Sequence, residues 1–162
     1  METDKTKKLI ALLNRKYILN LPVSGSFSEE SEDIIDKIYL AGLTFYNNNK
    51  FQQSKLIMQY LTLLKPYNTE YWKALASTLY MDKEYQRAIS CYNYLVILLP
   101  KDPYAYQHLA ESYFSIKDYP SAWKNLKKAK KVAKKNVTEY TQECKFIEAL
   151  EYSWNKFIPE KK

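Results

Sequence analysis

The chain has 162 residues, of which 46% are hydrophobic and only two are glycine. This length can bury a sizeable core as one domain, and the composition excludes a disordered chain and a β-rich fold with many tight turns. The net charge is +7, from 25 basic and 18 acidic residues.

The residues that usually carry chemistry are scarce. There is one histidine, His108, and the two cysteines, Cys91 and Cys144, lie far apart on apolar stretches, which predicts free buried thiols. Metal sites need closely spaced ligands, and the sequence also lacks a glycine-rich phosphate loop and a nucleophile motif. We therefore expect no catalytic residues, no cofactor, no metal and no small-molecule substrate.

The apolar runs are too short for a signal peptide or a membrane span. The run that begins at Leu9 ends after five residues at Asn14, and the run from Leu95 to Leu99 is also short. A signal peptide needs an apolar region of about 7–15 residues, and a spanning helix needs roughly 18. These lengths predict a soluble cytoplasmic protein that does not insert into a membrane.

Residues 1–27 are expected to form an N-terminal arm and linker. An amphipathic helix is predicted over residues 5–20, because its apolar side chains recur one turn apart; they are Leu9, Ile10, Leu13 and Tyr17. Proline, serine and glycine follow over residues 21–28 and indicate a linker. Ser28 and the acids after it are typical of a helix start.

Residues 28–136 contain three copies of a 34-residue pattern. Small residues recur in the first helix of each copy, at Gly42, Ala76 and Ala110, and in the second helix at Ser54, Ala88 and Ala122. Large residues recur four positions later, at Met58, Tyr92 and Leu126. Small residues let two helices approach and large ones fill the space between units, so the pattern predicts three tandem tetratricopeptide repeats, an all-α solenoid.

Residues 137–162 are expected to form a capping helix and tail. The helix is predicted to begin at Thr138 and carries apolar residues such as Ile147 and Trp154. A terminal helix of this kind covers the apolar side that the last repeat would otherwise expose.

The first helices of such repeats line a concave surface, which is the candidate binding site. Their inward positions include six aromatic or apolar residues that lie off the packing pattern, which indicates an exposed aromatic groove for an extended peptide. The candidate residues are Tyr39, Leu43, Tyr46, Lys73, Ser77, Tyr80, Tyr104, Gln107, Glu111 and Phe114. The alternative is that these side chains only pack between repeats.

The segment from Trp123 to Lys135 holds seven lysines and no acid, which equals the whole net charge. Its apolar residues, among them Leu126 and Ala129, form one stripe, so the lysines are predicted to cover a solvated face. An acidic protein surface, nucleic acid and an anionic membrane remain alternatives for this face, although the segment has no arginine for reading bases.

Several stretches resemble one family closely: Ile38-Tyr39 through Phe45-Tyr46-Asn47, Tyr67 to Tyr71, Leu75-Ala76, and Lys83 to Ala88. They are similar to the class II chaperones of bacterial type III secretion, over roughly residues 30–135. The resemblance implies three tetratricopeptide repeats behind a helical arm, and a non-catalytic cytoplasmic chaperone that keeps hydrophobic translocator proteins soluble before export. A translocator segment, often of the form PxLxxP, would lie in the groove against Tyr39, Leu43 and Tyr46.

The resemblance also implies a possible homodimer through the arm, here Leu9, Ile10, Leu13 and Tyr17. Family members are usually acidic, whereas this chain has a pI near 9.2. Another interpretation of the same fold is a tetratricopeptide adaptor that binds a different protein partner. Whether the arm dimerises or folds back on the repeats is left open by the sequence.

Overall fold

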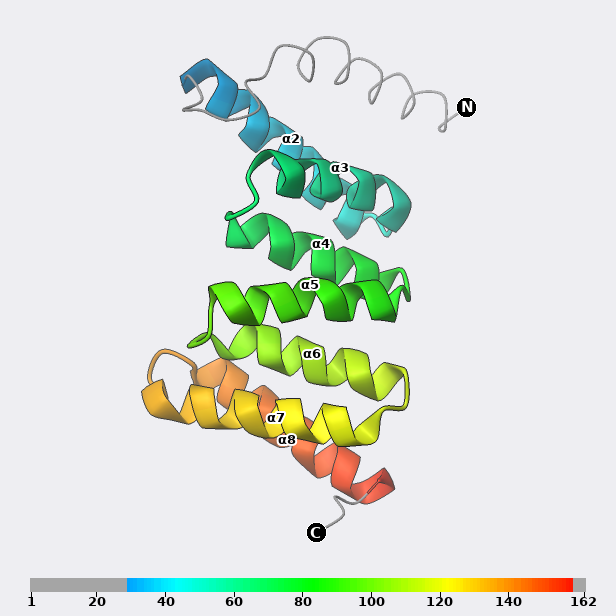
Figure 1. The fold of residues 1–162 in the computed structure, drawn as a ribbon, viewed down its shortest axis with the longest axis vertical. Coiled ribbons are helices and arrows are strands. Elements are labelled where there is room, and N and C mark those ends of the chain that lie inside the picture. Colours follow the sequence, from blue (N-terminus) through cyan, green and yellow to red (C-terminus); the bar gives the residue numbers. More distant parts are fainter. Residues whose placement is uncertain (1–28, 159–162) are drawn as a thin grey trace.

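The computed structural model describes residues 29–158, and every regular element in this part of the chain is a helix (Figure 1). The predicted arm residues Leu9, Ile10, Leu13 and Tyr17 lie outside the described residues. The α-helices are α2 (Glu29–Asn47), α3 (Phe51–Leu64), α4 (Thr69–Met81), α5 (Tyr85–Leu98), α6 (Pro103–Ser115), α7 (Tyr119–Ala133) and α8 (Thr141–Phe157).

The helices form antiparallel pairs that stack in chain order from α2 to α7 (Figure 1). Each pair is closed by a short turn, and each turn holds one non-glycine residue in the left-handed region. These residues are Asn49, Lys83 and Lys117, with φ of 57°, 63° and 65°. They are 34 positions apart, so the repeat extends to the backbone conformation of the turns.

The predicted packing residues form the contact between helices, which we call the seam. Ala76, Ala88 and Met58 are completely buried, and Tyr92 is 1% exposed. At Gly42 an added Cβ would lie 2.6 Å from the Met58 Cε atom and 2.9 Å from the Ile57 Cγ2 atom, so a side chain there would displace its neighbours. The packing pattern predicted from the sequence is therefore confirmed in all three units.

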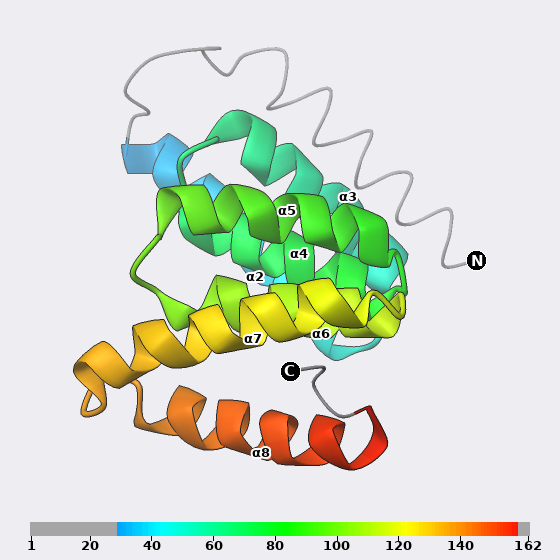
Figure 2. The same cartoon turned by 60° about the horizontal axis from the view of Figure 1, so that its bottom comes forward.

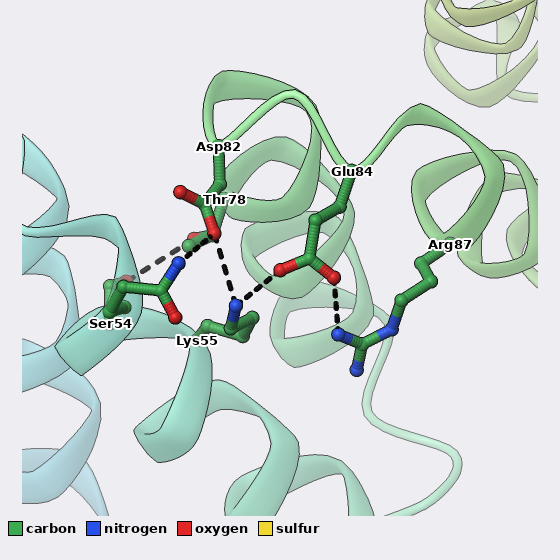
Figure 3. A network of polar contacts seen from close by, with 7 residues as sticks. Ser54, Lys55, Thr78, Asp82, Glu84 and Arg87 are labelled. Carbon is green, nitrogen blue, oxygen red and sulfur yellow. Dashed lines mark hydrogen bonds and ion pairs between the residues drawn. The ribbon is translucent and has the colours of Figure 1, made fainter.

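A lysine is buried between the first two units (Figure 3). Lys55 is 8% exposed, and its ammonium donates to Asp82 over 3.0 Å and also to Glu84, which in turn accepts from Arg87. Beside it, the buried hydroxyls of Ser54 and Thr78 lie 3.2 Å apart. A buried ammonium is tolerated only with such partners, so this network ties α3 to the turn between α4 and α5.

The C-terminal helix covers the last repeat (Figure 2). A 3-10 turn at Lys134–Asn136 and further turn residues precede α8, which begins at Thr141 and not at the predicted Thr138. Trp154 of α8 is 5% exposed and packs edge-on against Trp123 of α7, with ring centroids 5.7 Å apart. The predicted capping role of this helix is confirmed.

Candidate functional site

The first helices of the three units bring six of the ten predicted groove residues around one cavity of about 350 Å³. We call it the groove cavity. The six residues are Tyr39, Leu43 and Tyr46 from α2, Lys73 and Ser77 from α4, and Tyr104 from α6. Glu70, Ala74 and Thr78 complete the lining.

The aromatic residues of α2 belong partly to the core and partly to the cavity. Tyr39 packs against Tyr71 with ring centroids 5.1 Å apart, and Tyr46 packs edge-on against Phe51 at 5.7 Å. Both tyrosines are half-buried, and both still line the groove cavity. Each tyrosine therefore packs against a neighbouring ring and also lines the groove cavity, and peptide binding there stays a prediction.

Hydrogen bonds order the wall formed by α4 and α6. The Ser77 hydroxyl lies 2.9 Å from the Tyr104 hydroxyl and 3.4 Å from the Tyr92 hydroxyl. Burial raises the pKa of Tyr104 and of Tyr39 above the ordinary value. Both phenols are therefore neutral at physiological pH and can donate hydrogen bonds.

Lys73 supplies a positive charge in the cavity. Its ammonium lies 3.1 Å from Glu70 Oε1, 3.4 Å from Asp102 Oδ2 and 5.3 Å from the Tyr104 ring centroid. Burial opposes the charged form, but the hydrogen bonds and the negative charges of Glu70 and Asp102 outweigh it and raise the pKa of Lys73. The amine therefore stays charged, and it can bind a carbonyl or carboxylate oxygen of an occupant.

The other four predicted residues do not line this cavity. The Tyr80 hydroxyl lies 3.4 Å from the Ser115 hydroxyl, and Glu111 lies 2.6 Å from the His108 ring nitrogen Nδ1. Gln107 is buried, and Phe114 stacks on Trp154 of α8 with ring centroids 4.3 Å apart. The groove cavity therefore ends at Tyr104, and in the third unit α8 packs on Phe114.

His108 lies beside this site and packs against two tyrosines. Its ring stacks on Tyr92 at 5.6 Å and meets the edge of Tyr104 at 4.3 Å. Ala74 and Thr78 also line the groove cavity, but the sequence does not predict them as groove residues, because both are small residues next to the packing pattern. Their place in the cavity depends on how closely α2 approaches α4.

The lysine-rich segment lies on α7 with its charges outward. Trp123, Leu126 and Ala129 are buried, whereas most of the lysines are exposed. Lys130 pairs with Glu151 of α8, and Lys128 lies 4.7 Å from the Tyr106 ring centroid. The amphipathic pattern predicted for this segment is confirmed, and the alternative partners stay predictions.

The described residues hold no group of three or more histidine, cysteine or acidic side chains arranged for a metal ion. Cys91 and Cys144 are free thiols; Cys91 is buried and Cys144 half-buried. Burial raises the pKa of Cys91 to about 11, so this thiol is protonated and unreactive. No helix in residues 29–158 is long and apolar enough to cross a membrane.

Comparison with known proteins agrees with this fold. Residues 69–102 match the family model for a tetratricopeptide repeat. No curated protein matches the sequence. Among solved structures, PcrH from Pseudomonas aeruginosa is similar with a TM-score of 0.72 and 21% identity, over 82% of this chain and 98% of that one.

A second similar structure is the Yersinia enterocolitica type III secretion translocator chaperone SycD, with a TM-score of 0.72 and 19% identity, over 80% of this chain and 99% of that one. SycD in complex with a peptide of the translocator YopD has a TM-score of 0.61 and 21% identity, over 75% and 98% of the two chains. The chain has the fold of these chaperones. The tetratricopeptide-repeat fold inferred from the sequence is thereby confirmed, and the resemblance to the chaperone family is supported.

Proposed function

We propose that this protein is a chaperone of the type III secretion translocator class, and that it acts without catalysis in the bacterial cytoplasm. It binds an extended segment of a hydrophobic translocator in the groove cavity and keeps that protein soluble before export. The observation that carries this proposal is the cavity itself, in which residues from three successive repeats converge. The YopD peptide bound by the similar SycD supports it.

The lining suits an extended apolar chain. Burying three or four apolar side chains at about 1.5–3 kcal/mol each leaves micromolar affinity after the cost of association. Tyr39, Tyr46 and Leu43 offer apolar surface, while Lys73 and the neutral phenols provide donors for backbone carbonyl oxygens. Binding by these groups needs no covalent chemistry, and release is left to the export machinery.

We propose a division of the chain into three parts that fits this function. Residues 28–136 are the three repeats that carry the groove, and residues 137–162 contain the capping helix and a tail. Residues 1–27 are the arm, and we propose that it mediates a homodimer through Leu9, Ile10, Leu13 and Tyr17. Light scattering of a variant that lacks residues 1–27 tests the dimer, which should be lost while the helical content of the repeats remains.

Co-purification with the translocators of the same secretion system, read by mass spectrometry, tests the function. A matched pair of variants assigns the site: Tyr46→Ala in the groove cavity and Tyr67→Ala outside it, where the ring is 80% exposed. Tyr46→Ala should weaken capture about fivefold to thirtyfold, as truncation of a central aromatic residue does, and Tyr67→Ala should not. Equal capture by both variants contradicts the groove assignment. Recovery of another protein in place of a translocator would favour the adaptor interpretation.

A further inference from the structure

A second cavity lies where α8 begins, beside the groove cavity. Its volume is about 510 Å³, within the range of ligand pockets in proteins. Tyr104, Gln107 and His108 of α6 line one side, and Lys145 and Phe146 of α8 line the other. It is an open hollow on the surface between α6 and α8.

Tyr104 lines both cavities. Its hydroxyl is bonded to Ser77 of the groove cavity, and its ring lies edge-on to His108 of the second cavity, with centroids 4.3 Å apart. The two cavities therefore lie next to each other, on either side of one residue. In an extended chain, about three residues span 10 Å, so a bound peptide needs few residues to reach from the groove cavity to the second cavity.

One residue that lines the second cavity has a buried hydrogen-bond acceptor without a donor. Gln107 is 7% exposed, and its Oε1 atom accepts no hydrogen bond from any residue in 29–158. A buried polar atom in this state is costly, and an occupant that donates would remove the cost. An extended peptide carries a backbone N–H at almost every residue, so it is a suitable donor.

The same cavity also offers apolar surface. Phe146 is 46% exposed although it is a large hydrophobic residue at the start of α8. An acceptor beside an uncovered aromatic ring fits the backbone of an extended chain that carries an apolar side chain. Lys145 on the same turn can bind a backbone carbonyl oxygen of that chain.

We propose that the second cavity is a further subsite for the polypeptide segment that fills the groove cavity. It takes the residues that continue past Tyr104, with a backbone N–H bound to Gln107 and an apolar side chain on Phe146. This inference rests on the proposed function, since it needs a segment in the groove cavity. It assigns a binding role to α8 in addition to capping.

Site-specific photo-crosslinking in the full-length chain, co-expressed with the translocators, tests the subsite. Benzoylphenylalanine replaces Tyr46 in the groove cavity, Phe146 in the second cavity, or Tyr152, which is 78% exposed on α8 and lines neither. The expected result is that positions 46 and 146 label one translocator segment at sites about ten or fewer residues apart. Position 152 should label it much less.

Two outcomes at position 146 overturn the subsite while position 46 still labels the translocator. One is labelling no stronger than at position 152, and the other is labelling of the chain's own residues 1–28, which would then be the occupant. Failure at position 46 itself contradicts the groove function and the subsite with it. The two proposals therefore fail in distinguishable ways.

Affinity gives a second measurement. The labelled segment is synthesised at full length and without the residues that reach position 146. Phe146→Ala should lower the affinity for the long peptide about fivefold and leave the affinity for the short peptide unchanged, while Tyr152→Ala changes neither. An unchanged affinity of Phe146→Ala for the long peptide overturns the subsite.

Discussion

The seam and the groove cavity meet on the same helix and use neighbouring residues for different purposes. Ala76 of α4 is completely buried against the next helix, whereas Ser77 lines the groove cavity. Successive helical residues point about 100° apart, so one helix can stabilise the stack on one side and hold a partner on another. We therefore expect substitutions in the seam to change mainly the stability of the fold, and substitutions in the groove cavity to change mainly the affinity for a partner.

The largest expected effect is on the seam. Leu95 of α5 is completely buried, and Ile97, two positions further on, is 74% exposed. Leu95→Ala should lower the free energy of unfolding by about 2–5 kcal/mol through the cavity it leaves, and Ile97→Ala by less than about 0.5 kcal/mol. Chemical denaturation followed by circular dichroism measures both. Equal losses would mean that the outer face of α5 is also packed.

The buried lysine tests the polar part of the seam. Lys55→Met keeps an apolar stem of similar length but removes the donor that Asp82 and Glu84 share. We expect a loss of about 1–3 kcal/mol in the free energy of unfolding, because Asp82 loses its cation and Glu84 keeps only Arg87. Lys124→Met, at an exposed lysine of α7, is the matched control and should change little. No loss for Lys55→Met would show that its desolvation offsets its hydrogen bonds.

The positions of these residues show which part of the structure the sequence predicts. The 34-residue pattern predicts Ala76, Ala88 and Tyr92 as buried because each is decided by local spacing and side-chain size. Lys55 lies on α3 in a run with no unusual pattern, and its partners are 27 and 29 residues away. A local pattern cannot indicate such a pairing, since it depends on where the next turn lies in space.

The candidate site likewise has a part that the sequence predicts and a part that it does not. Tyr39, Leu43 and Tyr46 were predicted because the repeat fixes which side of α2 faces inward. The loss of Phe114 to a contact with Trp154 was not predicted, because α8 lies outside the repeat period and its docking angle depends on tertiary packing. The second cavity depends on that angle too, and no sequence signal indicates it.

A pH titration examines the seam network further. Hydrogen bonds from Lys55, with a further bond from Arg87, lower the pKa of Glu84 to about 2, against an ordinary value of 4.5. Between these values the unfolded chain binds a proton that the folded chain does not, so stability falls as pH drops from about 4.5 to about 2. Because the carboxylate is partly exposed, we expect about 1 kcal/mol over this window.

Glu84→Gln removes the titrating group and should therefore flatten this part of the pH profile. Urea unfolding at several values between pH 5 and pH 2.5 compares the two proteins. Above pH 4.5 the original protein should exceed Glu84→Gln in free energy of unfolding by the full amount. This difference should shrink as the pH falls toward 2. Parallel profiles for the two proteins would mean that the Glu84 carboxylate is not stabilised by its cations.

A small effect is also expected at the wall of the groove cavity, where the seam and the groove cavity touch. The Ser77 hydroxyl links the Tyr104 hydroxyl of the groove to the buried Tyr92 hydroxyl of the seam. Ser77→Ala and Tyr104→Phe should each cost about 0.5–1.5 kcal/mol of stability, the net value of one hydrogen bond. Because both remove the same bond, the double variant should lose less than the sum of the single variants.

This double-mutant cycle separates an ordered groove wall from a loose one. A coupling of about 0.5 kcal/mol or more means that α4 holds the Tyr104 ring in place before a partner arrives, so that a bound segment orders fewer side chains. Translocator affinity then falls in Ser77→Ala even though its apolar surface is intact. Additive losses would mean that the bond between Ser77 and Tyr104 contributes nothing to stability. The seam would then stabilise the fold and the groove would serve binding alone.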